Sequence, residues 1–449
     1  MLQPDKDSNN LGPAPTSRAG KRSAKKVPKL RRRSRRGLWP NQSGSYETQI
    51  LFAKMRLPFG SLAPPSGSHS GDSPHQIMTS RDLTSKANRA FEFAERQLRR
   101  LITNHSGHFP LFTKAGKWKH ESESWTNWCE GFLGGMLWIV ARRTGDTWWR
   151  AKAEEYSRLI EDRRLDRTVH DLGFLFLPTW KVWYELTGDK DIQKRVLEAG
   201  QTLAGRFQEK GQYLCSFVAP ESLFIDIMMN VGVIFYAAQE LGDAKLKEIA
   251  LKHCLTTRRF LVRGDGSTAH EGIFDLSSGA FLRQSTHQGW RGDSSWARGQ
   301  AWAIGGFTTA FRYTKETRFL DTAIATADYF IERTSPNGIP PNDWDQPAPK
   351  PIYESSAAAI AAGAFLDLAE QVTNPGLAQQ YQEQAKQTLG TLLTTEFLAI
   401  ERPEWEGILL HGIYHERKGL GVDESVMWGD YFFLAALDKL LQNAASSSV

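Results

Sequence analysis

The segment GFLGGMLWIVARRTGDTWWRAKAEEYSRLI, residues 131–160, decides the fold. Its first ten residues are almost entirely apolar or glycine, as in a helix that is buried on all sides. The Thr144-Gly145-Asp146 turn then supplies a glycine that can end one helix and an aspartate that can cap the next. After the turn, apolar residues recur with helical periodicity, which predicts an amphipathic helix over 147–162. The segment therefore predicts a hairpin of one buried and one surface helix.

The same hairpin pattern recurs along the chain from Ser80 onward. Related turns are Thr187-Gly188-Asp189 and Leu241-Gly242-Asp243, with looser versions at 314–316 and 373–375. The pattern predicts twelve helices, near residues 82–103, 128–143, 147–162, 171–186, 189–208, 225–240, 244–260, 296–313, 317–333, 355–371, 376–397 and 424–443.

The alternation of apolar and amphipathic helices predicts the architecture. A ring of inner helices within a ring of outer helices needs this alternation, so we predict an all-α (α/α)6 barrel. Short β patterns, at 272–275 with 281–283 and at 408–410 with 413–415, predict β-hairpin insertions. An α-solenoid is the alternative, but the spacings of 43 and then 54 residues between Gly145, Gly188 and Gly242 vary more than solenoid repeats do.

Composition excludes several classes of protein. Of the 449 residues, 40% are hydrophobic and 24% charged, which is enough to build a large core. The three cysteines, Cys129, Cys215 and Cys254, have no paired spacing, so we expect them to form no disulfide framework and no metal site. No apolar run approaches the roughly 18 residues of a membrane span.

The net charge of +6 is unevenly distributed. Residues 1–40 hold 12 Lys/Arg and two Asp, so the rest of the chain has a net charge of −4. We predict a disordered basic segment rich in Pro, Gly and Ser at 1–79, followed by a catalytic domain at 80–445. A solvated tail accounts for this segment better than a nucleic-acid partner does. Residues 34–38 resemble the start of a twin-arginine export signal, but no apolar stretch follows, so a cytoplasmic location is expected.

Polar residues stand at one level of the apolar helices. Trp128, Asp171, Asp226, Arg298 and Ser356 each precede the next turn by 15 to 17 residues. At 1.5 Å per residue, all lie roughly 24 Å from the turns, at the N-terminal ends of inner helices. We therefore expect them to surround one mouth of the barrel, where helix N-termini favour an anionic ligand.

Asp171 and Asp226 are the strongest candidates for a catalytic pair of carboxyl groups. Two carboxyl groups on adjacent inner helices would couple electrostatically, which suits acid/base chemistry. The alternative for each is N-capping, because aspartate is a preferred N-cap residue.

The segment 285–302 is the densest in functional residue types. It holds three Trp, two Arg, two Gln and one His. Tryptophan stacks on sugar rings and arginine binds carboxylates through paired hydrogen bonds, so the segment suits a charged carbohydrate. The alternative is that Trp296 and Trp302 pack in the core and Arg298 forms a structural ion pair. His270, by itself, would be an ordinary loop histidine.

Six stretches resemble glycoside hydrolase family 88, the unsaturated glucuronyl hydrolases. They occur in order over nearly all of 80–445, and their combination is specific although each is weak alone. The stretches are 128–138, 170–174, 226–230, 294–302, 355–362 and 428–431.

The resemblance implies an (α/α)6-barrel enzyme without a cofactor. Such enzymes remove the non-reducing-end 4,5-unsaturated uronic acid from lyase-generated oligosaccharides, here expected to be of the glycosaminoglycan type, by hydrating the C4=C5 double bond. Asp226 corresponds to the family's general acid/base and Asp171 to its second carboxylate. The other matching positions are the uronate-binding His270, Gln288, Arg298 and Trp302 and the stacking wall Trp128.

Two departures and two alternatives accompany the resemblance. Leu133 stands where the family often has an aromatic residue, and Glu354 where aspartate is common, which affects the expected shape of the outer subsites. An unsaturated rhamnogalacturonyl hydrolase is one alternative, although the 226–230 context favours family 88. A catalytically silent carbohydrate-binding barrel is the other, and the retention of both Asp171 and Asp226 argues against it. The sequence leaves the oligomeric state open.

Overall fold

The hairpin of residues 131–160 forms as predicted. In the computed structural model, which describes residues 80–119, 127–351 and 353–446, α3 (Glu130–Thr144) is buried from Gly131 to Ala141. Gly145, with φ 66°, ends α3 by donating its N–H to the Ala141 carbonyl. Helix α4 (Thr147–Leu159) buries only one face. The basic segment expected at 1–79 lies outside the described residues.

The inner elements form a closed ring. They are α3, the segment made of α5 (Leu172–Phe176), the π-helical turn η2 (Leu177–Lys181) and α6 (Val182–Thr187), the segment made of α8 (Ile227–Asn230) and α9 (Gly232–Leu241), α11 (Ala297–Thr314), α13 (Ser355–Ala369) and α15 (Met427–Ser446). Each contacts the next, and α15 returns to contact α3. The structure is therefore an (α/α)6 barrel, and this closure excludes the α-solenoid.

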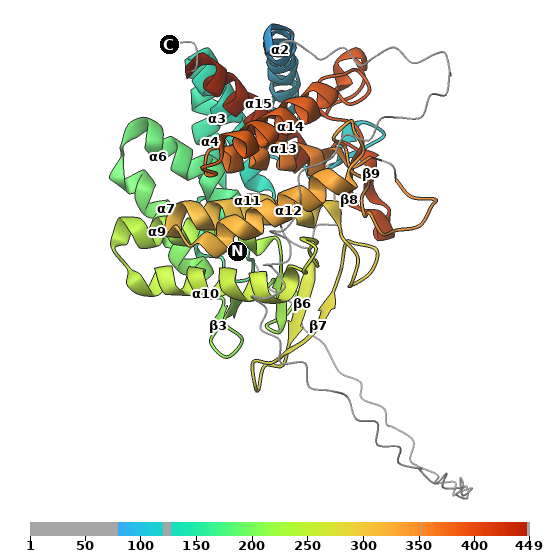
Figure 1. Ribbon diagram of the computed structural model, residues 1–449. Helices are drawn as coiled ribbons and strands as arrows, with labels where there is room; N and C mark the ends of the chain where they lie inside the picture. Colours follow the sequence, from blue (N-terminus) through green and yellow to red (C-terminus); the bar gives the residue numbers. More distant parts are fainter. Residues whose placement is uncertain (1–79, 120–126, 352, 447–449) are drawn as a thin grey trace, which may run out of the picture. The chain divides into compact units, whose positions relative to one another are not determined.

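Six outer helices cover the ring (Figure 1). They are α2 (Ser80–Asn104), α4, α7 (Lys190–Ala204), α10 (Ala244–Leu261), α12 (Thr317–Arg333) and α14 (Pro375–Leu392). A 3-10 turn, η1 (Glu161–Leu165), follows α4. All twelve predicted helices are present, but two inner ones are interrupted. Pro178 has no N–H to donate to the carbonyl four residues earlier, which accounts for the irregular turn after α5. The other break falls at Val231, between α8 and α9.

Two sets of strands lie on one side of the ring (Figure 1). β5 (Ser222–Phe224), β6 (Glu271–Phe274) and β7 (Phe281–Ser285) form an antiparallel sheet, and β8 (Gly412–His415) pairs with β9 (Leu420–Glu424). Short pairs also join β1 (Thr113–Lys114) to β2 (Lys117–Trp118) and β3 (Phe207–Gln208) to β4 (Tyr213–Leu214).

The hairpin predicted between 408–410 and 413–415 is wrong in its pairing. The structure pairs β8 with β9 instead. The backbone N–H groups of Ile408 and Leu409 are taken by the buried carboxylate of Asp430, at 2.9 and 2.8 Å. The same segment forms an isolated antiparallel bridge with another stretch of backbone, where Leu410 donates to the Phe397 carbonyl at 2.7 Å and the Ile408 carbonyl accepts from Ala399 at 3.0 Å. These partners replace the predicted pairing with β8.

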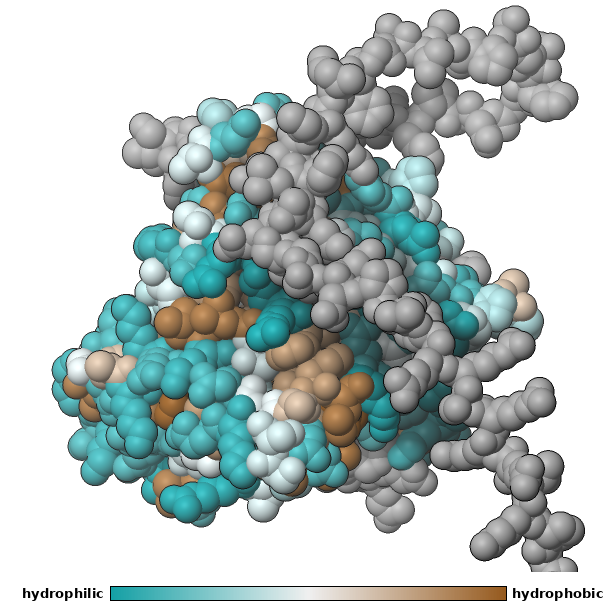
Figure 2. Space-filling view, turned by 60° about the horizontal axis from the view of Figure 1, so that its bottom comes forward, coloured by the Kyte–Doolittle hydropathy of each residue, from teal (hydrophilic) through white to brown (hydrophobic). Residues whose placement is uncertain are grey.

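Most exposed side chains on the described surface are polar. Figure 2 shows one face, on which hydrophobic side chains form patches separated by hydrophilic ones. Within the described ranges, no helix combines the length and the apolar character needed to cross a bilayer. Cys129, Cys215 and Cys254 are buried and unpaired, so they act as small apolar core residues.

Candidate active site

A pocket of about 830 Å³, partly open to solvent, lies where the inner elements begin. Its lining residues are Trp128, His170, Asp171, Phe174, Phe217, Val218, Phe224, Asp226, His287, Gln288, Trp296, Arg298, Trp302, Tyr414, His415 and Lys418. The constant spacing before each turn thus brings Trp128, Asp171, Asp226 and Arg298 to one mouth, as predicted. Ser356 is not a lining residue, because its hydroxyl is buried between Glu354 and Trp428.

The two pocket aspartates do not cap their helices. At the outer helices, Asp146, Asp189 and Asp243 have extended backbones and accept N–H bonds from the first turn, at 2.8 to 3.1 Å. Asp171 (φ −97°, ψ 17°) and Asp226 (φ −58°, ψ −28°) occupy the same position at α5 and α8, but neither side chain makes a cap hydrogen bond. The capping alternative is therefore excluded for both.

Each of these carboxyl groups keeps one oxygen available for a ligand. Among the described residues, Oδ2 of Asp171 and Oδ1 of Asp226 are buried without a hydrogen-bond partner. Burial without a partner is costly for a polar atom, and in native structures such atoms mark functional sites or bound solvent. Both oxygens belong to residues that line the pocket.

Asp171 is placed where its surroundings favour the protonated carboxyl group. Burial, and after it the negative charge of Asp226, raises the pKa of Asp171 well above its usual range. Its neighbour His170 lies with Nε2 3.3 Å from Asp171 Oδ1. Because burial lowers the pKa of His170 to about 3, this ring is neutral and does not pair with Asp171 as a cation.

The side chain that lies next to the carboxyl group of Asp226 is that of His270. Nε2 of His270 lies 3.6 Å from Asp226 Oδ2. The backbone N–H of His287 donates to Nδ1 of His270 at 3.1 Å, which places the ring's proton on Nε2, facing Asp226. His270 itself does not line the pocket; its ring packs between Phe224 and Trp296.

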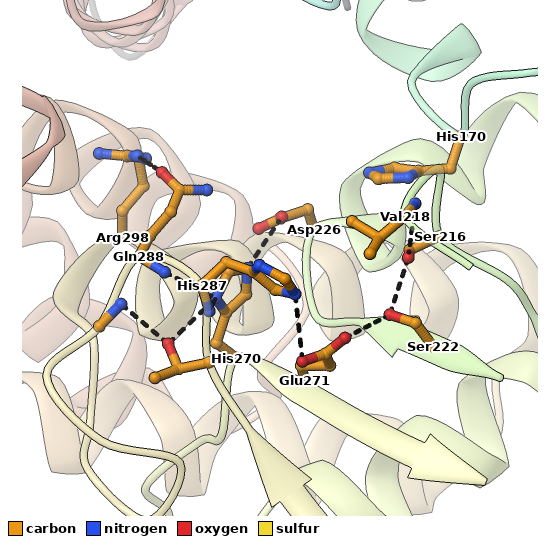
Figure 3. Close-up of polar contacts among 12 residues, drawn as sticks. His170, Ser216, Val218, Ser222, Asp226, His270, Glu271, His287, Gln288 and Arg298 are labelled. Atoms are coloured by element: carbon orange, nitrogen blue, oxygen red, sulfur yellow. Dashed lines mark hydrogen bonds and ion pairs between the residues drawn. The ribbon is translucent and has the colours of Figure 1, made fainter. Parts of the chain in front are cut away.

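Arg298 brings a buried positive charge to the pocket. Arg298 is only 1% exposed. It donates to Oε1 of Gln288 (Figure 3). It also donates to the carbonyls of Ile413 and Tyr414. The guanidinium also lies over the rings of Trp296 and Trp428. All three of its hydrogen-bond acceptors are neutral, and within the described ranges it forms no ion pair. The carboxyl groups whose charges act on Arg298 are Glu354 and Asp226, and neither is in ion-pair contact with it, so an anionic ligand can pair with it directly.

Aromatic side chains form the wall and floor around these groups. Trp128 packs against Phe174 and against Trp428, with ring centroids 5.8 and 4.8 Å apart. Trp302 is buried and contacts Phe174, at 5.1 Å. Neither of the two departures, Leu133 and Glu354, lines the pocket.

Part of the pocket comes from residues that sequence reasoning did not select. His287 belongs to the flagged segment 285–302 and pairs with buried Glu271 at 3.4 Å, and Glu271 accepts from Ser222 (Figure 3). The remaining ones stand in loops and strands, where no helical periodicity points to them: Phe217, Val218, Phe224, Tyr414, His415 and Lys418. The sequence feature that could have pointed to these residues is the set of short β patterns between the predicted helices, because such insertions cover the mouth of a helical ring.

Comparisons with known proteins agree with this geometry. The profile of Glycosyl Hydrolase Family 88 matches residues 99–419. The unsaturated glucuronyl hydrolase of Bacillus sp. (strain GL1) is 34% identical over 326 residues, which cover 70% of this chain and 86% of that protein.

Solved structures are similar over most of the chain. The crystal structure of the unsaturated glucuronyl hydrolase from Bacillus sp. GL1, described as responsible for the degradation of glycosaminoglycan, has a TM-score of 0.74 and 30% identity, and covers 80% of this chain and 97% of that one. A variant of the enzyme from Streptococcus agalactiae, complexed with dGlcA-GalNAc6S, has a TM-score of 0.68 and 26% identity, over 82% and 93% of the two chains. On the length of the family match and on these similarities, the chain belongs to glycoside hydrolase family 88, the family that contains the unsaturated glucuronyl hydrolases.

Proposed function

We propose that the protein removes the 4,5-unsaturated uronic acid at the non-reducing end of lyase-generated, glycosaminoglycan-type oligosaccharides by hydrating its C4=C5 double bond. We assign this activity to residues 80–445. The proposal rests on one arrangement: two buried carboxyl groups, each with an oxygen available, share a pocket with a buried arginine whose described partners are neutral. The complex of a relative with dGlcA-GalNAc6S supports an anionic sugar as the ligand.

In the proposed reaction, Asp226 is the general acid/base. Burial, and after it the negative charge of Asp226, raises the pKa of Asp171, which favours retention of a proton within this pair of carboxyl groups. Asp226 delivers the proton to C4, and positive charge develops at C5, where the ring oxygen shares it. Water then adds its oxygen to C5 and returns a proton to Asp226. The resulting hemiketal opens and releases the remaining sugar as an alcohol.

The other residues bind and orient the substrate in this proposal. Arg298 and Gln288 receive the uronate carboxylate, since the amide oxygen of Gln288 is held by Arg298 and its NH₂ group is left for a ligand. Trp128 and Trp302 contact the sugar faces. Asp171 holds sugar hydroxyls and supports the proton transfer. His270 acts through Asp226, because its ring lies behind that carboxyl group.

The test follows the ultraviolet absorbance of the C4=C5 bond in unsaturated disaccharides from glycosaminoglycan lyases. Wild-type protein should remove the absorbance, whereas Asp226→Asn should slow its loss by about 10²- to 10⁴-fold and still bind the disaccharide in calorimetry. Asp146→Asn is the matched control, because Asp146 caps α4 on the outer ring and does not line the pocket.

Three outcomes decide between the proposal and its alternatives. Loss of absorbance with wild type and Asp146→Asn, but not with Asp226→Asn, supports the proposal. Consumption of unsaturated rhamnogalacturonan fragments alone would favour the rhamnogalacturonyl hydrolase. Binding without any loss of absorbance on either class of fragment would favour a silent carbohydrate-binding barrel.

A further inference from the structure

Asn230 joins the starts of the two inner segments that carry the pocket aspartates. It is fully buried at the end of α8. Its Oδ1 accepts the N–H of Phe174 at 2.8 Å, and its Nδ2 donates to the carbonyl of Asp226 at 3.2 Å. The two backbones meet closely here, because a Cβ added to Gly173 would lie 2.5 Å from the Cα of Asn230.

The Phe174 N–H is the donor that an N-cap side chain normally takes. Phe174 is the third residue of α5, and an N-cap side chain accepts from the second or third N–H of its helix. Asp171 stands at the cap position but makes no such bond. At the outer helices, the aspartates at this position do make it. In α5 the acceptor comes instead from Asn230, on a different helix.

We infer that Asn230 is a positioning residue that takes the capping role at α5 and thereby leaves the carboxyl group of Asp171 free to face the pocket. The same side chain holds the backbone of Asp226, so one amide sets the relative position of both carboxyl groups. This assignment deepens the proposed function, on which its catalytic meaning rests. The capping relationship itself can be tested without substrate.

Removal of this amide has a defined consequence. Without it, the buried N–H of Phe174 has lost its acceptor, and an unsatisfied buried donor is costly. The carboxyl group of Asp171 then becomes the acceptor, as aspartates do at the outer helices. A hydrogen bond from a backbone N–H favours the ionised carboxylate, so the proton of the pair is lost at lower pH. The charged or titratable groups that act on Asp171 are His170, Asp226, Arg163, Arg206 and Asp166.

The experiment compares Asn230→Ala with wild type, Asn230→Asp and Thr308→Val. The pKa of Asp171 is read by NMR of isotope-labelled aspartate, with Asp171→Asn used to assign its signal. Thr308→Val is the matched control: it removes another fully buried hydrogen bond, from Thr308 to the Ile304 carbonyl at 2.7 Å, on α11. Thermal unfolding of all variants measures the cost to stability.

Asn230→Ala should lower the pKa of Asp171 relative to wild type and lower kcat more than it raises KM. Asn230→Asp keeps the acceptor oxygen for Phe174, so the pKa of Asp171 should not fall. Thr308→Val should lower the melting temperature and leave that pKa unchanged. If Asn230→Ala does not fold, Asn230→Ser is measured in its place, because its shorter side chain also withdraws the acceptor.

A melting-temperature loss in the Asn230 variant with an unchanged pKa of Asp171 would overturn the inference and leave a purely structural role. The two proposals fail separately. A lowered pKa in a protein that hydrolyses no unsaturated oligosaccharide would uphold the capping role and refute the proposed function. An unchanged pKa of Asp171 in the Asn230 variant of an active enzyme would refute the capping role and uphold the proposed function.

Discussion

Replacing Arg298 by lysine tests whether its guanidinium binds the carboxylate of the substrate. The guanidinium has five N–H donors. Three of them are used on Ile413, Tyr414 and Gln288, one from Nη1 and both from Nη2. One N–H on Nε and one on Nη1 remain for a ligand. A lysine ammonium has three donors in total, so the same protein acceptors can take all of them. The variant keeps the charge and loses the two remaining N–H donors.

The expected loss can be estimated from these two hydrogen bonds. A hydrogen bond to a charged group contributes about 1.5–3 kcal/mol, and neighbouring bonds are not additive. A combined loss of about 3 kcal/mol corresponds to a decrease of roughly 100-fold in kcat/KM. The methyl ester of the uronate should suffer a similar loss with the wild-type enzyme, because it lacks the negative charge.

The assay measures kcat/KM for the free acid and for the ester with wild type and Arg298→Lys. The preference for the acid should largely disappear in the variant. Arg312→Lys is the control and should keep the wild-type preference, since Arg312 is a partly exposed residue near the C-terminal end of α11, is paired with Asp367 of α13 and does not line the pocket. An Arg298→Lys enzyme that still prefers the acid by the wild-type factor would refute the assignment of Arg298 to the carboxylate.

Three stability predictions follow from the buried carboxyl groups and the packed glycines. Asp171 holds its proton to higher pH in the folded state than in the unfolded chain, so the folded protein loses stability as pH rises from about 4 through the raised pKa. Asp171→Asn should therefore increase the free energy of unfolding, by an amount that grows with pH in urea titrations; a pH-independent change would contradict this. Burial alone would raise the pKa of Glu271, but hydrogen bonds from a histidine and a serine outweigh it and lower that pKa. Its ionised form thus stabilises the fold above about pH 4.3, the unfolded value, and Glu271→Gln should destabilise by about 1–3 kcal/mol at pH 7 and by less in acid. Gly131→Ala would place a Cβ 2.2 Å from the Phe174 carbonyl oxygen and should destabilise by about 1–3 kcal/mol, whereas Gly363→Ala, with 3.7 Å to its nearest neighbour, should be neutral or stabilising by up to about 1 kcal/mol in thermal melts. Equal effects of the two glycine substitutions would show that the helix contact at Gly131 is looser than described.

The helical part of the fold follows from local patterns. Residues 131–140 are apolar on every side and 147–159 on one face, and these two patterns have few stable arrangements other than an inner and an outer helix. The pairing of β8 was not predictable in the same way. The competing acceptor for Ile408 and Leu409 is Asp430, which lies about 20 residues later in the sequence and on a different helix.

The residues of the site divide in the same way, into those that helical patterns predict and those that they do not. Trp128, Asp171, Asp226 and Arg298 stand at or near the starts of inner segments of similar overall length, so their spacing from the turns placed them at one mouth. His415 and Lys418 reach the pocket from the β8–β9 hairpin, whose position depends on contacts with distant helices. Helical periodicity carries no information about such segments.

The sequence by itself determined the succession of inner and outer helices, the end of the barrel that carries the polar residues, and the family resemblance. These are local properties, because they depend on residues within one or two helical turns of each other. The tertiary structure alone decided which aspartates are caps. Asp146 and Asp171 both begin helices and are indistinguishable as residue types, yet one side chain is used by its own helix and the other is not. The difference is Asn230, which reaches Phe174 from a neighbouring helix and so leaves Asp171 in the pocket.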